Sequence, residues 1–300
     1  MKKLKTPRLG LAFFGLLAFA LPVLAQAPRA SVATRHSLWK IEGTKSTVYL
    51  MGSVHVLKPE NYPLPAPLES AFTNSQIAVF ETDMGEMEKS ETQTKLLSKA
   101  QLPAGETLAD QLSPEVYAQF TKHLETAGLP AMMFTQLKPS MAAIMVLVLE
   151  LQKMGLNPEQ GMDKHFFTLA KEQGKQIVGL ESLDFQIGLI TDFTKAEGEA
   201  LMRSTLKDLD QFKSKIGDLL KAWETGDSER LQKLLNEFVE EEPALYKRLL
   251  TDRNKSWIPK IEEFSKGDKN TIVIVGAGHL VGKEGVVELL KKKGLKVTQL

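Results

Sequence analysis

The stretch TIVIVGAGH, residues 271–279, decides the fold, because a β-branched apolar run ends there in a glycine-rich turn that carries a histidine. A short apolar run of this kind is typical of a strand buried in a parallel sheet. An earlier segment, TVYLMGSVH at residues 47–55, has the same form, so His55 and His279 each follow a strand and a glycine three residues upstream. Because α/β proteins build their sites at strand ends, the two histidines indicate where the protein functions.

A single Gly-x-x-His match is short, and it occurs by chance in many proteins. Taken alone, such a histidine is most simply a turn residue or a buried, hydrogen-bonded one. The repetition of strand, glycine and histidine favours a functional interpretation. Glycine permits the tight turn that aims an imidazole into a crevice, and imidazole binds a metal or moves a proton near neutral pH.

Further apolar runs extend this pattern along the chain. The expected strands span residues 38–42, 47–51, 76–80, 176–180, 271–275 and 295–298. The first two are separated by Gly43-Thr44-Lys45 and predict an opening hairpin. A short helix between the second and the third implies that these two strands form a parallel pair. We therefore expect an α/β (α+β) fold with a central mixed, mainly parallel sheet flanked by helices.

Two long segments, at about residues 84–174 and 195–266, carry helical patterns. Ser113-Pro114-Glu115 is a good helix start, and the apolar run within residues 140–154 is too short to cross a bilayer and predicts a buried helix. Since no Gly/Ser-rich or Pro-rich linker divides the chain, we expect residues 28–300 to form one domain with these segments as helical insertions.

Residues 1–27 are typical of an export signal. A basic start (Lys2, Lys3, Lys5, Arg8) is followed by an apolar stretch and by Ala25-Gln26-Ala27, which fits a cleavage site. The stretch is short for a membrane span, so we expect a cleaved signal, a periplasmic location and no stable membrane anchor. The absence of cysteine excludes attachment through a lipobox.

Charge and motifs exclude several classes of function. Removal of residues 1–27 takes away four of the 38 basic residues and none of the 37 acidic ones, which leaves a net charge of about −3. No basic field remains to attract nucleic acid. Ser53 lacks a Gly-x-Ser-x-Gly elbow, and Gly276-Ala277-Gly278-His279 lacks the third glycine of a dinucleotide site. The expected partner is therefore a peptide or small-molecule substrate.

Four candidate site residues lie just beyond predicted strands, namely His55, Glu81, Glu181 and His279. A sheet that aligns these strand ends gathers two imidazoles and two carboxylates. Two histidines and one carboxylate can bind a divalent metal and leave positions for water and substrate, while the second glutamate serves as general base. Without a metal, the same four residues can run acid/base hydrolysis, with His55 activating water. The residues alone leave both alternatives open.

Two further polar positions have two interpretations each. Asp163 follows the Gly161 turn and begins a helix, where the helix dipole alone explains an acid, so a site role and a capping role are equally supported. Arg253-Asn254 lies in a helical stretch. A surface arginine is the ordinary interpretation, but an inward one can bind a carboxylate or phosphate bidentately.

Together these segments resemble the TraB/GumN family, whose clan includes the Tiki metalloproteases and, more remotely, erythromycin esterase-like hydrolases and ChaN-like haem-binding proteins. The resemblance is carried by residues 51–56, 62–68, 79–81, 161–163, 179–181 with Gln186, 253–254 and 275–282. Their order and combination are far more specific than either Gly-x-x-His motif alone.

The resemblance implies a divalent metal held by His55, Glu81 and His279, with manganese or cobalt favoured and zinc possible. We take His55, Glu81, Glu181, His279 and Arg253 as candidate catalytic residues. The leading hypothesis is a periplasmic metal-dependent hydrolase, with a peptidase expected. The alternatives are a non-catalytic periplasmic binding protein for a peptide, haem or envelope component, and a metal-free esterase-like hydrolase.

Overall fold

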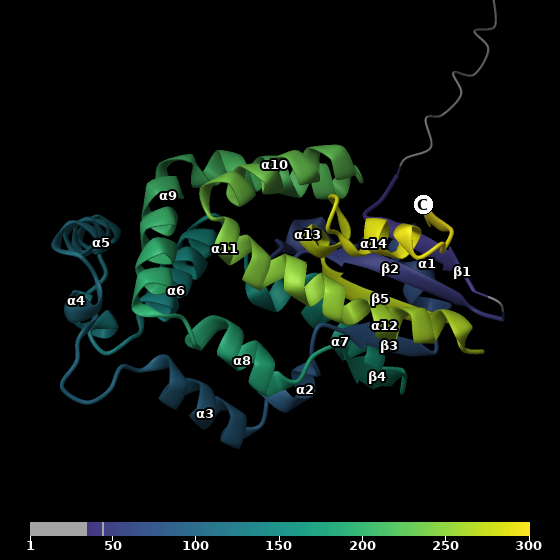
Figure 1. The fold of residues 1–300 in the computed structure, drawn as a ribbon, viewed down its shortest axis with the longest axis horizontal. Coiled ribbons are helices and arrows are strands. Elements are labelled where there is room, and N and C mark those ends of the chain that lie inside the picture. Colours follow the sequence, from purple (N-terminus) through teal and green to yellow (C-terminus); the bar gives the residue numbers. More distant parts are fainter. Residues whose placement is uncertain (1–34, 44) are drawn as a thin grey trace, which may run out of the picture. The chain divides into compact units, whose positions relative to one another are not determined.

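The computed structural model describes residues 35–43 and 45–300, and the expected export signal lies outside them. Its sheet has six strands in the order β4-β3-β5-β2-β1-β6. The strands are β1 (Leu38–Glu42), β2 (Thr47–Ser53), β3 (Ile77–Phe80), β4 (Gln176–Gly179), β5 (Thr271–Gly276) and β6 (Val297–Gln299) (Figure 1). The last strand begins two residues later than the sequence pattern predicts.

The parallel part of the sheet forms around β5. This strand pairs in parallel with β2 on one side and with β3 on the other, and β3 pairs in parallel with β4. Every residue of β5 is buried, as expected for an apolar β-branched strand covered on both faces. Strand β1 pairs antiparallel with β2, and β6 completes the sheet by pairing antiparallel with β1. The predicted α/β class with a mixed, mainly parallel sheet is confirmed.

The predicted parallel pairing of β2 with β3 is wrong, although the two strands run in the same direction. Strand β5 lies between them and pairs with both. The physical reason is burial, because a central position covered on both faces favours the most apolar strand. Strand β2 has half-buried residues at Thr47 and Tyr49, whereas β5 has none.

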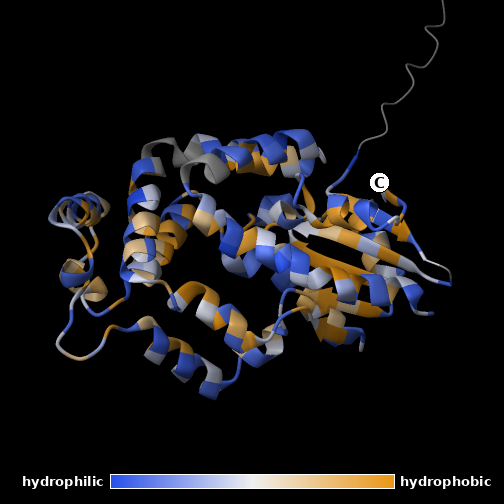
Figure 2. Ribbon diagram, in the orientation of Figure 1, coloured by the Kyte–Doolittle hydropathy of each residue, from blue (hydrophilic) through white to orange (hydrophobic). Residues whose placement is uncertain are grey.

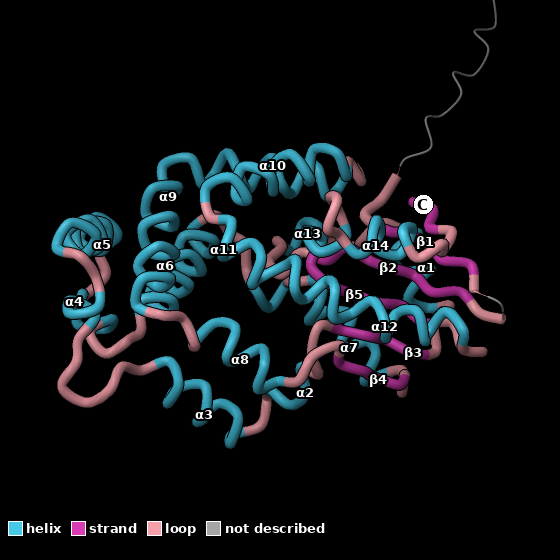
Figure 3. Tube along the Cα trace, in the orientation of Figure 1, coloured by secondary structure: helices cyan, strands magenta, loops and turns pink. Residues whose placement is uncertain are grey.

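Helices and the loops that join them form the rest of the described residues (Figure 3). They are α1 (Ala66–Thr73), α2 (Met84–Met87), α3 (Ser90–Ala100), α4 (Leu108–Gln111), α5 (Pro114–Ala127), α6 (Pro139–Lys153), α7 (Met162–Glu172), α8 (Leu183–Thr191), α9 (Lys195–Glu224), α10 (Ser228–Glu241), α11 (Pro243–Tyr246), α12 (Asp252–Lys266), α13 (Ala277–Leu280) and α14 (Val286–Lys292). Short 3-10 turns occur at η1 (Pro59–Asn61), η2 (Ala131–Phe134) and η3 (Pro158–Gln160), and η4 (Lys247–Thr251) is a π-helical turn.

The helical segments have a core of their own. Side chains of α4, α5, α6, η2 and α9 cluster around Phe120 and Phe134, whose ring centroids are 5.4 Å apart. In α6 the residues Ala142 and Val146 are buried, whereas Ile144 is partly exposed. The apolar run in this region is therefore a helix, as predicted, but it is buried on one side only.

The main core lies between the sheet and its covering helices. Figure 2 shows strand β5 as hydrophobic, while the helices alternate between hydrophobic and hydrophilic residues. Such alternation is typical of helices that pack one face on a core. Among the described residues, none of the helices combines the length and the apolar character needed to cross a bilayer.

Candidate functional site

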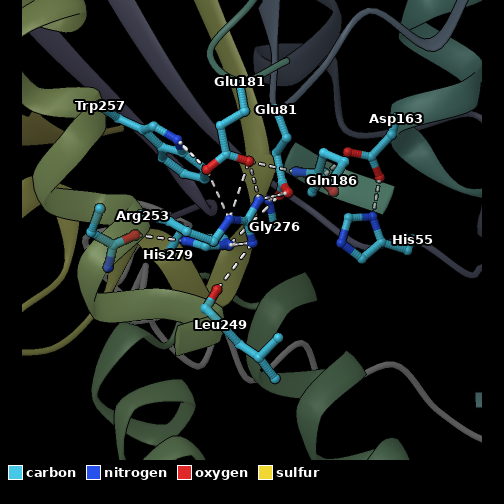
Figure 4. Close-up of polar contacts among 12 residues, drawn as sticks. His55, Glu81, Asp163, Glu181, Gln186, Leu249, Arg253, Trp257, Gly276 and His279 are labelled. Carbon is cyan, nitrogen blue, oxygen red and sulfur yellow. Dashed lines mark hydrogen bonds and ion pairs between the residues drawn. The ribbon is translucent and has the colours of Figure 1, made fainter. Parts of the chain in front are cut away.

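The carboxyl ends of the parallel strands bring the predicted site residues together. Strands β2 and β5 end opposite each other at Ser53 and Gly276, and β3 ends at Phe80, opposite Ile274. Beyond β3 and β4 the alignment continues, because the N–H of Glu181 donates to the carbonyl of Glu81 over 2.8 Å. Figure 4 shows Glu81, Glu181 and His279 around the side chain of Arg253, with His55 to one side. The sequence prediction that these strand ends meet is confirmed.

His55 is held by Asp163, which lies 108 residues later in the chain. The Met162 N–H donates to the Val54 carbonyl over 3.0 Å and places the first turn of α7 against the turn after β2. One Asp163 oxygen lies 2.8 Å from His55 Nδ1, and the other accepts from Ser53 Oγ over 2.7 Å. Because the carboxylate accepts, Nδ1 carries the proton, and Nε2 of the neutral ring is a free acceptor.

The charge of Asp163 raises the pKa of His55 to about 9, with a smaller contribution in the same direction from Glu81, while burial and Arg253 oppose the increase. The ring is nevertheless 65 % exposed, so the principal cause is the short contact with the Asp163 carboxylate. The neutral, basic form of His55 therefore increases as the pH rises toward 9.

We expect a histidine NMR titration to give a pKa of about 9 for His55 in the wild type, and about 6.5 in Asp163→Asn. Asparagine keeps the size of the side chain and removes the charge that stabilises the imidazolium. The Asp184→Asn variant is the control, because it removes a carboxylate that is 70 % exposed and pairs with Lys95. A His55 titration that Asp163→Asn leaves unchanged would show that another group sets its pKa.

Arg253 is buried in the middle of the site, with 6 % of its side chain exposed. It lies in the first turn of α12, directly after the π-helical turn η4. All five N–H groups of its guanidinium find acceptors, on both Glu181 oxygens, Glu81 Oε2, the Leu249 carbonyl and His279 Nε2. No N–H is left for an anionic ligand, so Arg253 orients the side chains around it.

Glu181 is the counter-ion of this arginine. Its Oε1 accepts from Arg253 Nε and from Trp257 Nε1, each over 2.9 Å. Its Oε2 accepts from Gln186 Nε2 over 2.6 Å and from Arg253 Nη2 over 2.9 Å. The side chain is 6 % exposed. A carboxylate with four donors has no free lone pair for a proton, so the geometry favours a positioning role over the predicted role of general base.

His279 is fixed as a neutral imidazole. Asn254 donates its amide to the Glu284 carbonyl over 2.9 Å, so its Oδ1 faces His279 Nδ1 at 2.6 Å. Nδ1 therefore carries the proton, and Nε2 accepts from Arg253 Nη1 over 3.0 Å. Burial lowers the pKa of His279 to about 3, with Arg253 acting in the same direction and Glu81 opposing it. The ring is uncharged near neutral pH.

Glu81 differs from Glu181 because one of its carboxylate oxygens, Oε1, faces the space over Gly276. Its Oε2 faces Arg253, and its Oε1 accepts from the Gly276 N–H over 2.9 Å. Burial acts to raise the pKa of this carboxyl, but His279 when protonated, Arg253, His55 and the Gly276 amide together hold it well below its usual range. Since His279 is neutral, Arg253 and His55 supply the positive charge. Glu81 is therefore an ionised carboxylate near neutral pH.

Gly276 leaves a small space that three groups face. A methyl group on its Cα would lie 3.3 Å from His55 Nε2, 3.4 Å from Glu81 Oε1 and 3.6 Å from His279 Cδ2. A water molecule in this space would contact the free imidazole nitrogen and the open carboxylate oxygen together. We take this space as the candidate position of a reacting atom.

We expect Gly276→Ala to lower kcat/KM by about 10- to 100-fold without loss of the fold, because a displaced reacting atom costs this much. The backbone at Gly276 has a φ of −49°, which alanine adopts without strain. Steady-state kinetics and thermal unfolding measure the two effects. Gly278→Ala is the matched control, because its methyl group would meet only the Leu235 side chain, at 3.5 Å. Equal losses of kcat/KM in both variants would mean that the substitutions act through the conformation of the turn and not through the space over Gly276.

The three predicted metal ligands do not fit a metal ion as a set. Among the described residues, no group of three His, Cys, Asp or Glu side chains is arranged to hold one. The lone pair of His279 Nε2 and the Oε2 of Glu81 both face Arg253. Of the three, His55 alone keeps a nitrogen that no protein donor occupies.

Three residues that complete the site were missed as functional residues by the sequence analysis. Trp257 and the Leu249 carbonyl contact the Glu181–Arg253 pair, and Gln186 holds Glu181. One signal was present, since Leu249, Arg253 and Trp257 are spaced by four residues and such residues share one face of a helix. Nothing in that spacing indicates that the face points into the site.

Fold and site together define an α/β protein with a cluster of ionisable side chains at the carboxyl ends of its parallel strands. The model of the TraB/PrgY/gumN family matches residues 37–299, and the chain belongs to this family. The resemblance noted in the sequence is therefore confirmed.

Three similar proteins are described as uncharacterised. The chain is 26% identical over 244 residues to the uncharacterised protein YbaP of Escherichia coli (strain K12), which is 81% of this chain and 87% of that protein. YbaP of Shigella flexneri aligns to the same extent. An uncharacterised protein of Treponema pallidum (strain Nichols) is 23% identical over 149 residues, or 46% of this chain and 45% of that protein. No solved structure matches the chain significantly.

Proposed function

We propose that the protein is a hydrolase in which His55 activates a water molecule. One observation carries this proposal: His55 Nε2 and Glu81 Oε1 face the same space over Gly276, and Asp163 holds the other nitrogen of the ring. A base whose orientation is fixed by a carboxylate, next to a site for the reacting atom, is the arrangement that general-base catalysis requires.

Each group has a defined part in the proposed reaction. Neutral His55 takes a proton from water on Nε2 while the water oxygen adds to the carbonyl carbon of an ester or amide. Asp163 stabilises the imidazolium that forms, as the carboxylate does in a Ser-His-Asp triad. The same Nε2 then returns the proton to the ester oxygen or amide nitrogen as the bond from that atom to the carbonyl carbon breaks, which releases the alcohol or amine and leaves the carboxylic acid. Glu81 is ionised and accepts a hydrogen bond from the water, which orients it toward the substrate.

Two finer points of the proposal come from the sequence. A peptide bond is the preferred substrate bond, on the resemblance to peptidases, and the periplasm is the proposed location, on the pattern of residues 1–27. Manganese- or cobalt-dependent hydrolysis stays a prediction, because Arg253 already contacts two of the three groups that such an ion would need.

Oxygen-18-labelled water provides the test. We expect the wild type to convert members of a panel of p-nitrophenyl esters and peptides, with the label found in the product carboxylate by mass spectrometry. Glu81→Gln keeps the shape of the side chain and removes its charge, so it should abolish labelling. Glu60→Gln is the control, because that carboxylate is 70 % exposed. Labelling that Glu81→Gln leaves unchanged, or saturable binding of panel members without product, would contradict the proposal.

A further inference from the structure

Arg253 contacts two of the three side chains, Glu81 and His279, at which the sequence resemblance places a divalent metal. Its guanidinium contacts Glu81, Glu181 and His279, which come from three different strand ends. We infer that Arg253 is a built-in cation that replaces a metal ion in this protein, so that a divalent cation binds through His279 only when Arg253 is removed.

The first step of the argument concerns the nitrogen atoms of His279. A neutral imidazole has one lone pair available to a metal. Here Nδ1 carries a proton that it donates to Asn254, and the lone pair of Nε2 accepts from Arg253 over 3.0 Å. A metal bound by this ring would therefore have to displace the guanidinium or break the contact with Asn254.

The second step concerns charge. Glu81 and Glu181 contribute two negative charges, and one guanidinium contacts both of them. A divalent ion bound to the same carboxylates would lie against this positive charge in a poorly solvated place, where repulsion is strong. Arginine does not lose its proton in proteins, so the repulsion would persist over the whole working pH range.

The third step concerns how firmly Arg253 is held. Its side chain is 6 % exposed, its guanidinium carbon lies 5.0 Å from the centroid of the Trp257 ring, and all five N–H groups have acceptors. Moving it aside would break these hydrogen bonds and leave a buried charge without partners, which is costly. Displacement by an incoming metal is therefore disfavoured as well.

Equilibrium dialysis against Co²⁺ with elemental analysis, combined with the visible absorption of protein-bound Co²⁺, tests the inference. The wild type should bind no stoichiometric Co²⁺ through His279. Arg253→Met frees Glu81 Oε2 and the lone pair of His279 Nε2 and removes the positive charge beside Glu181. It should bind one Co²⁺ per chain at least about tenfold more tightly than the wild type does. Arg253→Met combined with His279→Ala should lose this binding.

Arg203→Met is the matched control, because it removes an arginine that is 48 % exposed beside Glu199 and offers no histidine. It should gain no Co²⁺ site. Stoichiometric binding by the wild type that His279→Ala abolishes would overturn the inference, and that comparison stands even if Arg253→Met does not fold. A folded Arg253→Met that gains no binding would overturn it too. No substrate is needed, so failure of the hydrolase proposal would be seen separately.

Discussion

Arg253→Met is expected to lower the free energy of unfolding by about 3–5 kcal/mol, the cost of breaking a buried ion pair by removing one partner. Methionine is unbranched and keeps apolar contact with Trp257, so little of the loss comes from packing. What remains is Glu81 and Glu181, 15 % and 6 % exposed, without the cation between them. Urea unfolding followed by circular dichroism at neutral pH measures the change.

The pH dependence of that loss identifies its cause. Without Arg253, repulsion and burial raise the pKa of one carboxyl in the folded variant above its value in the unfolded chain. The folded variant then binds protons more readily, so its deficit relative to the wild type should shrink as the pH falls from 7 toward about 5. Arg203→Met should change stability by less than about 0.5 kcal/mol, as exposed substitutions do. A deficit for Arg253→Met of less than about 1 kcal/mol, the range of exposed pairs, would contradict the buried network.

Local patterns were sufficient to predict the strands but not their order. The apolar runs that precede Glu81, Glu181 and Gly276 are strong local signals, and each of them is a strand in the structure. The insertion of β5 between β2 and β3 depends on pairing between residues about 200 positions apart, which no short pattern encodes. Direction could be predicted, because a crossover helix enforces it, whereas adjacency could not.

The candidate site, too, could be predicted only in part from local patterns. Which side chains lie at the strand ends follows from the strands, but which of them stay reactive depends on hydrogen bonds across the site. Asp163 could be explained by the dipole of its helix until the backbone contact after β2 placed it against His55. The sequence allowed an inward Arg253 that binds a carboxylate, but nothing in it indicated that this arginine would contact both Glu181 and the acceptor nitrogen of His279.

The site has two parts, a rigid half and an open half. In the rigid half, Arg253, Glu181 and the His279–Asn254 pair satisfy one another and are almost fully buried. In the open half, His55 is 65 % exposed and keeps a free nitrogen. A catalytic group must reach its substrate while its support stays fixed, so the proposed reaction assigns chemistry to the open half and positioning to the rigid one.

His55→Ala should therefore lower kcat/KM by about 100- to 10,000-fold, the usual contribution of a positioned general base. The unfolding free energy should change by less than about 1 kcal/mol, because the ring is largely exposed and its contact with Asp163 lies at the edge of the core. A large loss of activity with little loss of stability distinguishes a catalytic group from a structural one. Steady-state kinetics on a substrate identified in the labelling experiment, together with urea unfolding, measures both quantities.

Asp163, which holds His55, provides a further test of this prediction. Asp163→Asn should also reduce kcat/KM strongly. The double variant His55→Ala/Asp163→Asn should be no slower than His55→Ala alone, because Asp163 acts through the His55 ring and the effects of members of a catalytic unit do not add. His123→Ala is the control, since that side chain is 20 % exposed and contacts Glu150 away from the site. Additive losses in the double variant would mean that Asp163 acts independently of His55. Full activity of His55→Ala would rule out His55 as the base.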